Sequence, residues 1–173
     1  MNIDEYAWNR HEQKLKEQVG FTSSKSKIKI VDAIALRNKV EEQLENLPQK
    51  SLCQWAIKVA TPFLAHLDLH LKDDLRIITG LKALDERLTG NLRAYDFRKV
   101  GFTVNELAKE SESIVSRYAA RSFAQAIATG HMRGHAMVSS DYAIKVVNTL
   151  TNESLEASTN ERERQLKIIE DFL

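Results

Sequence analysis

The sequence contains few of the residues that build tight turns: among its 173 residues there are six glycines and two prolines. All-β folds need many such turns, so this scarcity favours helices. The single cysteine, Cys53, excludes an internal disulfide framework and agrees with a reducing compartment. No apolar run approaches the roughly 18 residues of a membrane span, and the first residues lack the pattern of a secretory signal. We therefore expect a cytoplasmic location and no membrane partner.

A net excess of positive charge is also missing, because 25 Lys and Arg residues face 24 Asp and Glu residues, for a formal net charge of +1. Nucleic-acid binders usually carry a clear basic excess, since neutralising phosphates supplies much of their affinity. Nucleic acid is therefore not the expected partner, although a local basic patch is compatible with this balance. The length suits one domain, and the shares of 43% hydrophobic and 28% charged residues are ordinary for a globular protein.

Apolar residues recur every three to four positions along most of the chain, which is the period of an α-helix. This spacing predicts helices over about 4–18, 30–47, 51–67, 75–89, 139–150 and 160–172, and either one long helix or two in series over 92–129. The only candidate strand, Lys27–Val31, would have no partner to pair with. We therefore predict an all-α protein, a single compact bundle of about six to eight helices. Residues 1–24 are expected to form an N-terminal helical arm and loop, and residues 25–173 the helical domain.

Local signals predict where several helices begin and end. Ser51 with Gln54 has the pattern of a capping box, and Asp73 or Asp74 is placed to cap the next helix, which Gly90 ends in the left-handed conformation. Further predicted starts are Ser139 or Ser140 with Asp141 in the first turn, and Asn160 with Glu163. Pro62 should kink the helix over 51–67, because proline lacks a backbone donor.

Two features concern packing. The segment 119–128 is rich in alanine, and small side chains let a neighbouring helix approach closely, so we place this segment at the centre of the bundle. The alternating charges of Glu161–Arg164 are typical of a solvated helix face stabilised by i, i+3 and i, i+4 pairs.

Four histidines form two pairs with i, i+4 spacing, His66 with His70 and His131 with His135. On a helix this spacing places two imidazoles on one face, where they could share a metal, and facing pairs could build a metal centre of a helical-bundle enzyme. Asp68, Asp73 and Asp74 could add oxygen ligands. The simpler alternative is that the histidines cap helix ends or form local hydrogen bonds. The second pair straddles Gly130 and Gly134, and the first lacks the glutamate of a zinc-protease helix.

Arg121 stands out within the alanine-rich segment, where it must reach solvent or find a carboxylate, because an unpaired buried charge is costly. A salt bridge between helices, to Asp141 or Asp96, is the structural interpretation. The functional interpretation is a contact between Arg121 and a partner or an anion. In that case the protein would be a helical bundle that binds a small ligand or an anion around Arg121. Tyr142 is expected in the core with its hydroxyl at the edge.

No arrangement of residues predicts catalysis. Cys53 lies one position from a core face, where cysteine is usually inert packing. The sequence contains neither a phosphate loop nor a dinucleotide-binding fingerprint. We therefore predict a protein that is not an enzyme, with no catalytic residues, no cofactor and, outside the histidine alternative, no metal.

The stretch Ala119–Ala136, which contains Ala-Ala-Arg, Ala-Thr-Gly-His and Gly-His-Ala, continues into Asp141-Tyr142-Ala143-Ile144-Lys145. It resembles the signature of the helical immunity proteins assigned to bacterial polymorphic toxin systems. Upstream, Trp55, Pro62-Phe63-Leu64, Asp74 with Arg76, and Gly90 follow in the expected order, so the resemblance covers roughly residues 50–148. The chain departs from the pattern at Gln125, where many relatives carry histidine, and at Gly130, where they carry alanine.

This resemblance implies a function by binding. A member of the family would hold a cognate toxin domain inactive through an occluding interface, which needs a rigid scaffold with aromatic or arginine anchors rather than a catalytic group. The binding residues that it implies here are Arg121, His131, His135, Asp141 and Tyr142.

Overall fold

The computed structural model describes residues 10–173, with side chains at Lys14 and from Lys16 onwards. Its elements are α2 (Arg10–Val19), α3 (Ile34–Leu44), α4 (Gln49–Ala60), the 3₁₀ helices η1 (Thr61–His66) and η2 (Leu69–Leu71), α5 (Leu75–Leu88), α6 (Ala94–Glu110), α7 (Ile114–Ala128), α8 (His135–Leu150) and α9 (Leu155–Glu170). Residues 10–173 include no strand, so the predicted all-α class is confirmed. The helix expected over 4–18 is seen from Arg10, and its first residues, 4–9, lie outside the described part.

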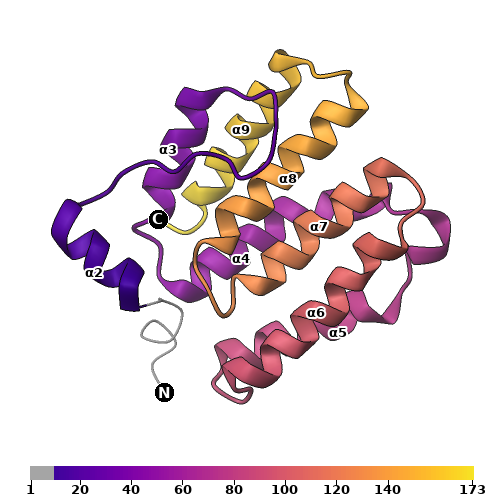
Figure 1. Cartoon of the computed structure of the whole chain (residues 1–173), viewed down its shortest axis with the longest axis horizontal. Helices are drawn as coiled ribbons and strands as arrows, with labels where there is room; N and C mark the ends of the chain where they lie inside the picture. The colour runs from indigo at the N-terminus through magenta and orange to yellow at the C-terminus, as the bar shows by residue number, and fades with distance from the viewer. Residues whose placement is uncertain (1–9) are drawn as a thin grey trace.

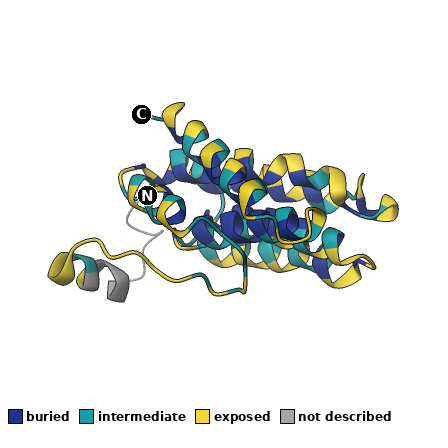
Figure 2. Ribbon diagram, turned by 90° about the horizontal axis from the view of Figure 1, so that it is seen from above, coloured by how far each residue is buried: buried dark blue, intermediate teal, exposed yellow. Residues whose placement is uncertain are grey.

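Helix α7 occupies the centre of the bundle (Figure 1), as the alanine-rich segment predicted. It packs against α8, α6, α4 and η1, and more lightly against α5. Ala119, Ala120 and Ala126 are fully buried on it, which allows this many neighbours to approach. On one side of α7 lie α5 and α6, and on the other α8 and α4 lead on to α9 and α3. The buried residues gather where these helices face one another (Figure 2).

Two contacts show how tightly the core is built. Trp55 of α4 is fully buried, and its indole N–H donates to the carbonyl oxygen of Gln165 in α9 at 3.0 Å. Gly130, in the turn after α7, approaches the side chains of Leu84 and Phe97 so closely that a Cβ atom there would lie 2.7 Å from each. The glycine that departs from the family pattern is therefore the residue that this packing requires.

The segment before α3 is extended but forms no strand. The backbone N–H of Val31 donates to Oδ1 of Asn148 at 2.8 Å, and the carbonyl oxygen of Val31 accepts from Nδ2 of Asn148 at 2.9 Å. The same carbonyl oxygen accepts from the hydroxyl of Ser158 in α9 at 2.7 Å. Side chains of α8 and α9 thus form the hydrogen bonds with the backbone of Val31 that a neighbouring strand would form in a sheet.

Several predicted helix ends are confirmed. The carboxylate of Asp74 accepts from the backbone N–H of Arg76 and caps α5. Gly90 follows α5 with a φ of 81°, the left-handed conformation expected of it. The segment 92–129 divides into α6 and α7, and Ser113 caps the second.

Other predicted starts are wrong, and the hydroxyl groups explain why. Ser51 lies inside α4, which begins directly after Pro48. Ser139 and Ser140 lie inside α8, where their hydroxyls donate to the carbonyl oxygens of Ser122 and Met137. A serine can bond within a helix or across to a neighbour as readily as it caps, so the local pattern was ambiguous.

Two more boundaries differ from prediction. Helix α9 begins at Leu155 rather than Asn160, because the hydroxyl of Ser154 caps it by accepting from the backbone N–H of Ala157. Pro62 does not kink a long helix. Helix α4 ends at Ala60 and Pro62 lies in the first turn of η1, where its missing donor costs no hydrogen bond.

Candidate functional site

Asp141, one of the predicted binding residues, lies in the middle of α8 and is buried between two arginines. The guanidinium of Arg37 donates to both carboxylate oxygens, from Nε to Oδ1 and from Nη2 to Oδ2, each at 2.9 Å. Nη2 of Arg162 donates to Oδ1 at 2.7 Å. The prediction that Asp141 lies in a first helical turn is wrong, because α8 begins at His135. Its carboxylate is instead the shared acceptor of a buried ion cluster.

Arg162 completes this cluster from α9. Its guanidinium donates to the carboxylate of Asp32, with Nη2 and Oδ2 2.6 Å apart, and Nη1 donates to Ser140 and Gln165. Its side chain has no exposed surface. The prediction that Glu161–Arg164 forms a solvated face is therefore wrong for Arg162, and for Glu161, which is also buried.

The cluster binds four parts of the chain together: the extended segment, α3, α8 and α9. Its two arginines and two aspartates balance in charge, and each guanidinium makes several hydrogen bonds, which is the condition for burying charged groups. We assign Asp141 a supporting position behind the surface rather than on it.

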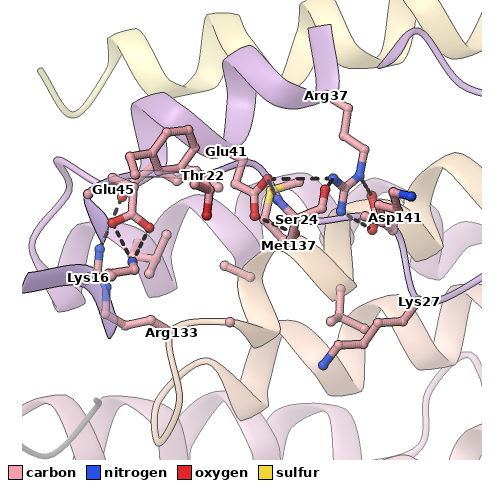
Figure 3. A pocket seen from close by; sticks show the side chains of 18 of the residues that line it. Lys16, Thr22, Ser24, Lys27, Arg37, Glu41, Glu45, Arg133, Met137 and Asp141 are labelled. Atoms are coloured by element: carbon pink, nitrogen blue, oxygen red, sulfur yellow. Dashed lines mark hydrogen bonds and ion pairs between the residues drawn. The ribbon is translucent and has the colours of Figure 1, made fainter. Parts of the chain in front are cut away.

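A cavity of about 490 Å³ lies between the N-terminal segment and the bundle (Figure 3). At one end an ion pair joins Lys16 of α2 to Glu45, and at the other Arg37 meets Asp141. The backbone N–H of Ser24 donates to Oε2 of Glu41 at 2.8 Å. These contacts fix the N-terminal segment onto its own bundle.

Arg121 is exposed and makes neither of the salt bridges predicted for it. Asp96 pairs with Arg93 of its own helix, and Asp141 belongs to the buried cluster. Instead Nη1 of Arg121 donates to the hydroxyl of Tyr142 at 3.1 Å, and its guanidinium lies 5.8 Å from the centre of that ring. The helical stripe on which Arg121 lies faces solvent, so its charge needs no buried partner.

Tyr142 connects Arg121 to a larger cluster across α7 and α8. Its ring stacks on that of Tyr118, with 6.3 Å between centroids. Nζ of Lys145 lies 5.7 Å from the centre of the Tyr118 ring and donates to the carbonyl oxygen of Lys29 at 2.8 Å. We call Tyr118, Arg121, Tyr142 and Lys145 the arginine–tyrosine cluster.

Tyr118 and Lys145 are not among the predicted site residues, although the sequence contains a signal for them. Tyr118 precedes Arg121 by three positions, and Tyr142 precedes Lys145 by three. Each tyrosine and its cation therefore share a helix face. Which two faces meet depends on how α7 and α8 pack, which no local pattern shows.

His131 and His135 lie together beside a second cavity, of about 350 Å³, at the end of α7. Their ring centroids are 5.0 Å apart. Oε1 of Gln125 lies 2.6 Å from Nδ1 of His135, so the residue that departs from the family pattern forms a hydrogen bond with one histidine of the pair. Phe102 and Asn105 of α6 line the opposite wall.

Both histidines are held in the neutral form. The pKa of His131 is lowered to about 4, chiefly by burial and also by the nearby His135, Arg98 and Arg87. The pKa of His135 is also lowered to about 4, chiefly by burial and also by the charges of Lys27 and Arg98. Nδ1 of His131 is buried and has no hydrogen-bond partner within residues 10–173.

The other pair, His66 and His70, lies exposed at the opposite end of α7. Between them, Asp68 accepts hydrogen bonds from the backbone N–H groups of Glu112 and Ser113, directly before α7. His131 follows the other end of this helix, whose 15 residues span about 22 Å at 1.5 Å per residue. The four histidines therefore do not form one site, and no three metal-ligating side chains gather anywhere in the described residues.

Two further expectations concern single residues. Arg121 lines neither cavity, which leaves a ligand-binding bundle built around it without the inward-pointing arginine that such a site needs. Cys53 is fully buried, and this burial raises the pKa of its thiol to about 12. A thiol held protonated in this way is a poor nucleophile.

By these features the protein is an all-α bundle with polar side chains on the surface of one pair of packed helices. The model of the family described as Imm-5 like putative immunity protein matches residues 42–172, and the chain belongs to this family. The resemblance based on residues 50–148 is thereby confirmed and extends further in both directions. No curated protein and no solved structure matches the chain. Among the described helices, none is both long and apolar enough to cross a membrane.

Proposed function

We propose that this protein binds a cognate bacterial toxin in the cytoplasm and neutralises it by occluding its active region. The family match over residues 42–172 carries this proposal, because it covers α4 to α9 and the surface that they form. Neutralisation by occlusion needs a rigid surface and no catalytic group.

The arginine–tyrosine cluster is the part of the surface best suited to the contact. Arginine and tyrosine are enriched among the residues that dominate binding energy at protein interfaces. Arg121 is exposed, and Tyr142 and Tyr118 are held against each other, so little side-chain freedom is lost when a partner binds. The buried ion cluster around Asp141 holds α8 in place beneath this surface.

The histidine pair extends this surface towards the end of α7. Gln125 lies one helical turn after Arg121 and bonds His135, so the two groups share one side of the α7–α8 pair. Neutral imidazoles can donate and accept hydrogen bonds without the cost of removing a charge from water.

The test is to express the toxin domain encoded beside this gene, with and without this protein. We expect the two proteins to co-purify and the toxin to lose its effect on cell growth. A neighbouring toxin that neither binds nor loses its toxicity would remove the immunity function.

A variant then tests the surface. Arg121→Ala should weaken toxin binding about tenfold, the scale of an interface anchor. Arg93→Ala is the matched control, since Arg93 is an exposed arginine at the start of α6 paired only with Asp96. Equal binding by both variants would place the contact elsewhere on the bundle.

A further inference from the structure

The two helices that carry the arginine–tyrosine cluster contribute almost no acidic side chains to the surface. Between Ser113 and Leu150 the only acidic residue is Asp141, and its carboxylate is buried between Arg37 and Arg162. The segment 18–31, which crosses α8, contains no acidic residue either.

Basic side chains lie on the same surface. The exposed ones are Arg117 and Arg121 of α7 and Lys25, Lys27 and Lys29 of the N-terminal segment, and with the half-buried Lys145 of α8 we call them the basic face. Arg117 and Arg121 are one helical turn apart. The hydrogen bond from Lys145 to the carbonyl oxygen of Lys29 joins the helices to the segment. In Figure 1, α7 and α8 lie in front of α4, and the N-terminal segment crosses in front of α9.

Several cations elsewhere on the molecule form salt bridges, and those of the basic face do not. Lys58 pairs with Asp171, Arg76 with Asp74 and Glu110, and Lys109 with Glu106. None of the six residues of the basic face forms a salt bridge with a residue that the structure describes. In a chain with a formal net charge of +1, six cations without a salt-bridge partner among the described residues therefore belong to one surface.

We propose that the basic face docks against an acidic surface of the toxin, so that the partner is an acidic protein. This inference rests on the proposed function and specifies the chemistry of its partner. Charge complementarity of this kind speeds encounter and sets orientation, while the tyrosines beneath supply packing.

The structure favours a protein over a nucleic acid as the acidic partner. Single-stranded nucleic acids are bound by aromatic rings with a free face for stacking. Here Tyr118 and Tyr142 stack on each other, and Lys145 and Arg121 lie over them. Exposed carboxylates on α3 and α9, at Glu42, Glu156, Glu163 and Glu170, would also oppose a polyanion longer than this face.

The experiment measures binding of the neighbouring toxin domain by calorimetry at about 50 and about 300 mM NaCl, on either side of physiological screening. The test variant is Arg117→Glu with Arg121→Glu, and the matched control is Lys72→Glu with Lys82→Glu, which makes the same change in net charge on exposed residues outside the basic face. We expect the test variant to lose about tenfold or more in affinity at low salt and the control to change less than about twofold. A thermal melt of each variant verifies the fold.

The outcomes separate the two proposals. Toxin affinity that is unchanged in the test variant, at both salt concentrations, would overturn the acidic-partner inference and leave the immunity function standing. A toxin that does not bind the unmodified protein would remove both. Tight binding of a duplex or single-stranded DNA of about 30 nucleotides, lost in the test variant only, would assign the face to nucleic acid instead.

Discussion

Asp141 is the residue whose observed surroundings differ most from those that the sequence predicted. Its position in the family-like segment suggested a binding group, and Ser139-Ser140-Asp141 read locally as a helix start. In the structure two arginines donate to its carboxylate, Arg37 from α3 and Arg162 from α9. Burial of two guanidinium groups is tolerated only while the carboxylates are present.

Asp141→Ala should therefore lower the free energy of unfolding by about 3–5 kcal/mol, because it leaves buried positive charge without its acceptor. Urea denaturation measures this change. Asp171→Ala is the control, since it removes an exposed pair with Lys58 and should cost less than about 1 kcal/mol. A loss for Asp141→Ala no larger than that of the control would show that the ion cluster does not hold the fold.

The histidine pair makes stability depend on pH. The pKa of His131 and of His135 is lowered from an ordinary 6.5 to about 4 in the folded protein, so between these values the unfolded chain binds more protons. Stability should be full above pH 6.5 and fall as the pH drops towards 4. Thermal melts across this range measure the fall.

Replacing both residues, His131→Gln with His135→Gln, should flatten this profile. The matched control is His66→Gln with His70→Gln, which changes two exposed histidines at the other end of α7 and should keep the wild-type profile. A profile unchanged in the first variant would assign the pH dependence to other groups.

At the scale of elements, the sequence predicted which segments are helical and where most of them break. The period of the apolar residues is a property of each helix by itself, so it can be seen locally. Helix starts were predicted less well, because serines such as Ser139 bond to carbonyl groups that only folding brings near. The burial of Arg162 could not be predicted, since its partner Asp32 is 130 positions away.

The extended segment before α3 depends on one side chain of α8. Asn148 bonds both backbone groups of Val31 and also donates to Ser158. Asn148→Ala should lower the free energy of unfolding by about 1–3 kcal/mol, the cost of leaving buried polar groups unpaired. It should also speed tryptic cleavage at Lys25, Lys27 and Lys29.

Limited proteolysis measures this release, with Asn160→Ala as the control because Asn160 is an exposed asparagine of α9. Cleavage that is equally slow in both variants would mean that the segment is held by other contacts.

At the scale of the whole molecule, charge is unevenly distributed although it nearly cancels. The composition indicates only that positive and negative charges nearly cancel. The basic face exists only in the folded protein, because folding buries Asp141 and places residues 25–29 beside α8. The candidate site was therefore predictable in part: Arg121 and Tyr142 were identified, while Lys145 and the lysines of the N-terminal segment needed the fold.

Ion exchange provides a test that needs no toxin. Each lysine or arginine changed to glutamate lowers the net charge by two, so both double variants move from +1 to −3. On a sulfonate resin at neutral pH, the variant Arg117→Glu with Arg121→Glu should elute earlier than the variant Lys72→Glu with Lys82→Glu, because a resin senses local charge. Equal elution would show that the positive charge is not concentrated on this face.

The buried ion cluster also determines how short a fragment of this chain can fold. The family match begins at residue 42, but Asp32 and Arg37 lie upstream of it and neutralise Arg162 and Asp141, which lie inside it. A fragment cut at that boundary would bury an arginine without its full set of acceptors and leave Asn148 without the backbone of Val31. We therefore expect the smallest fragment that folds by itself to begin before residue 42, since a boundary drawn from the family match alone would divide the core of this protein.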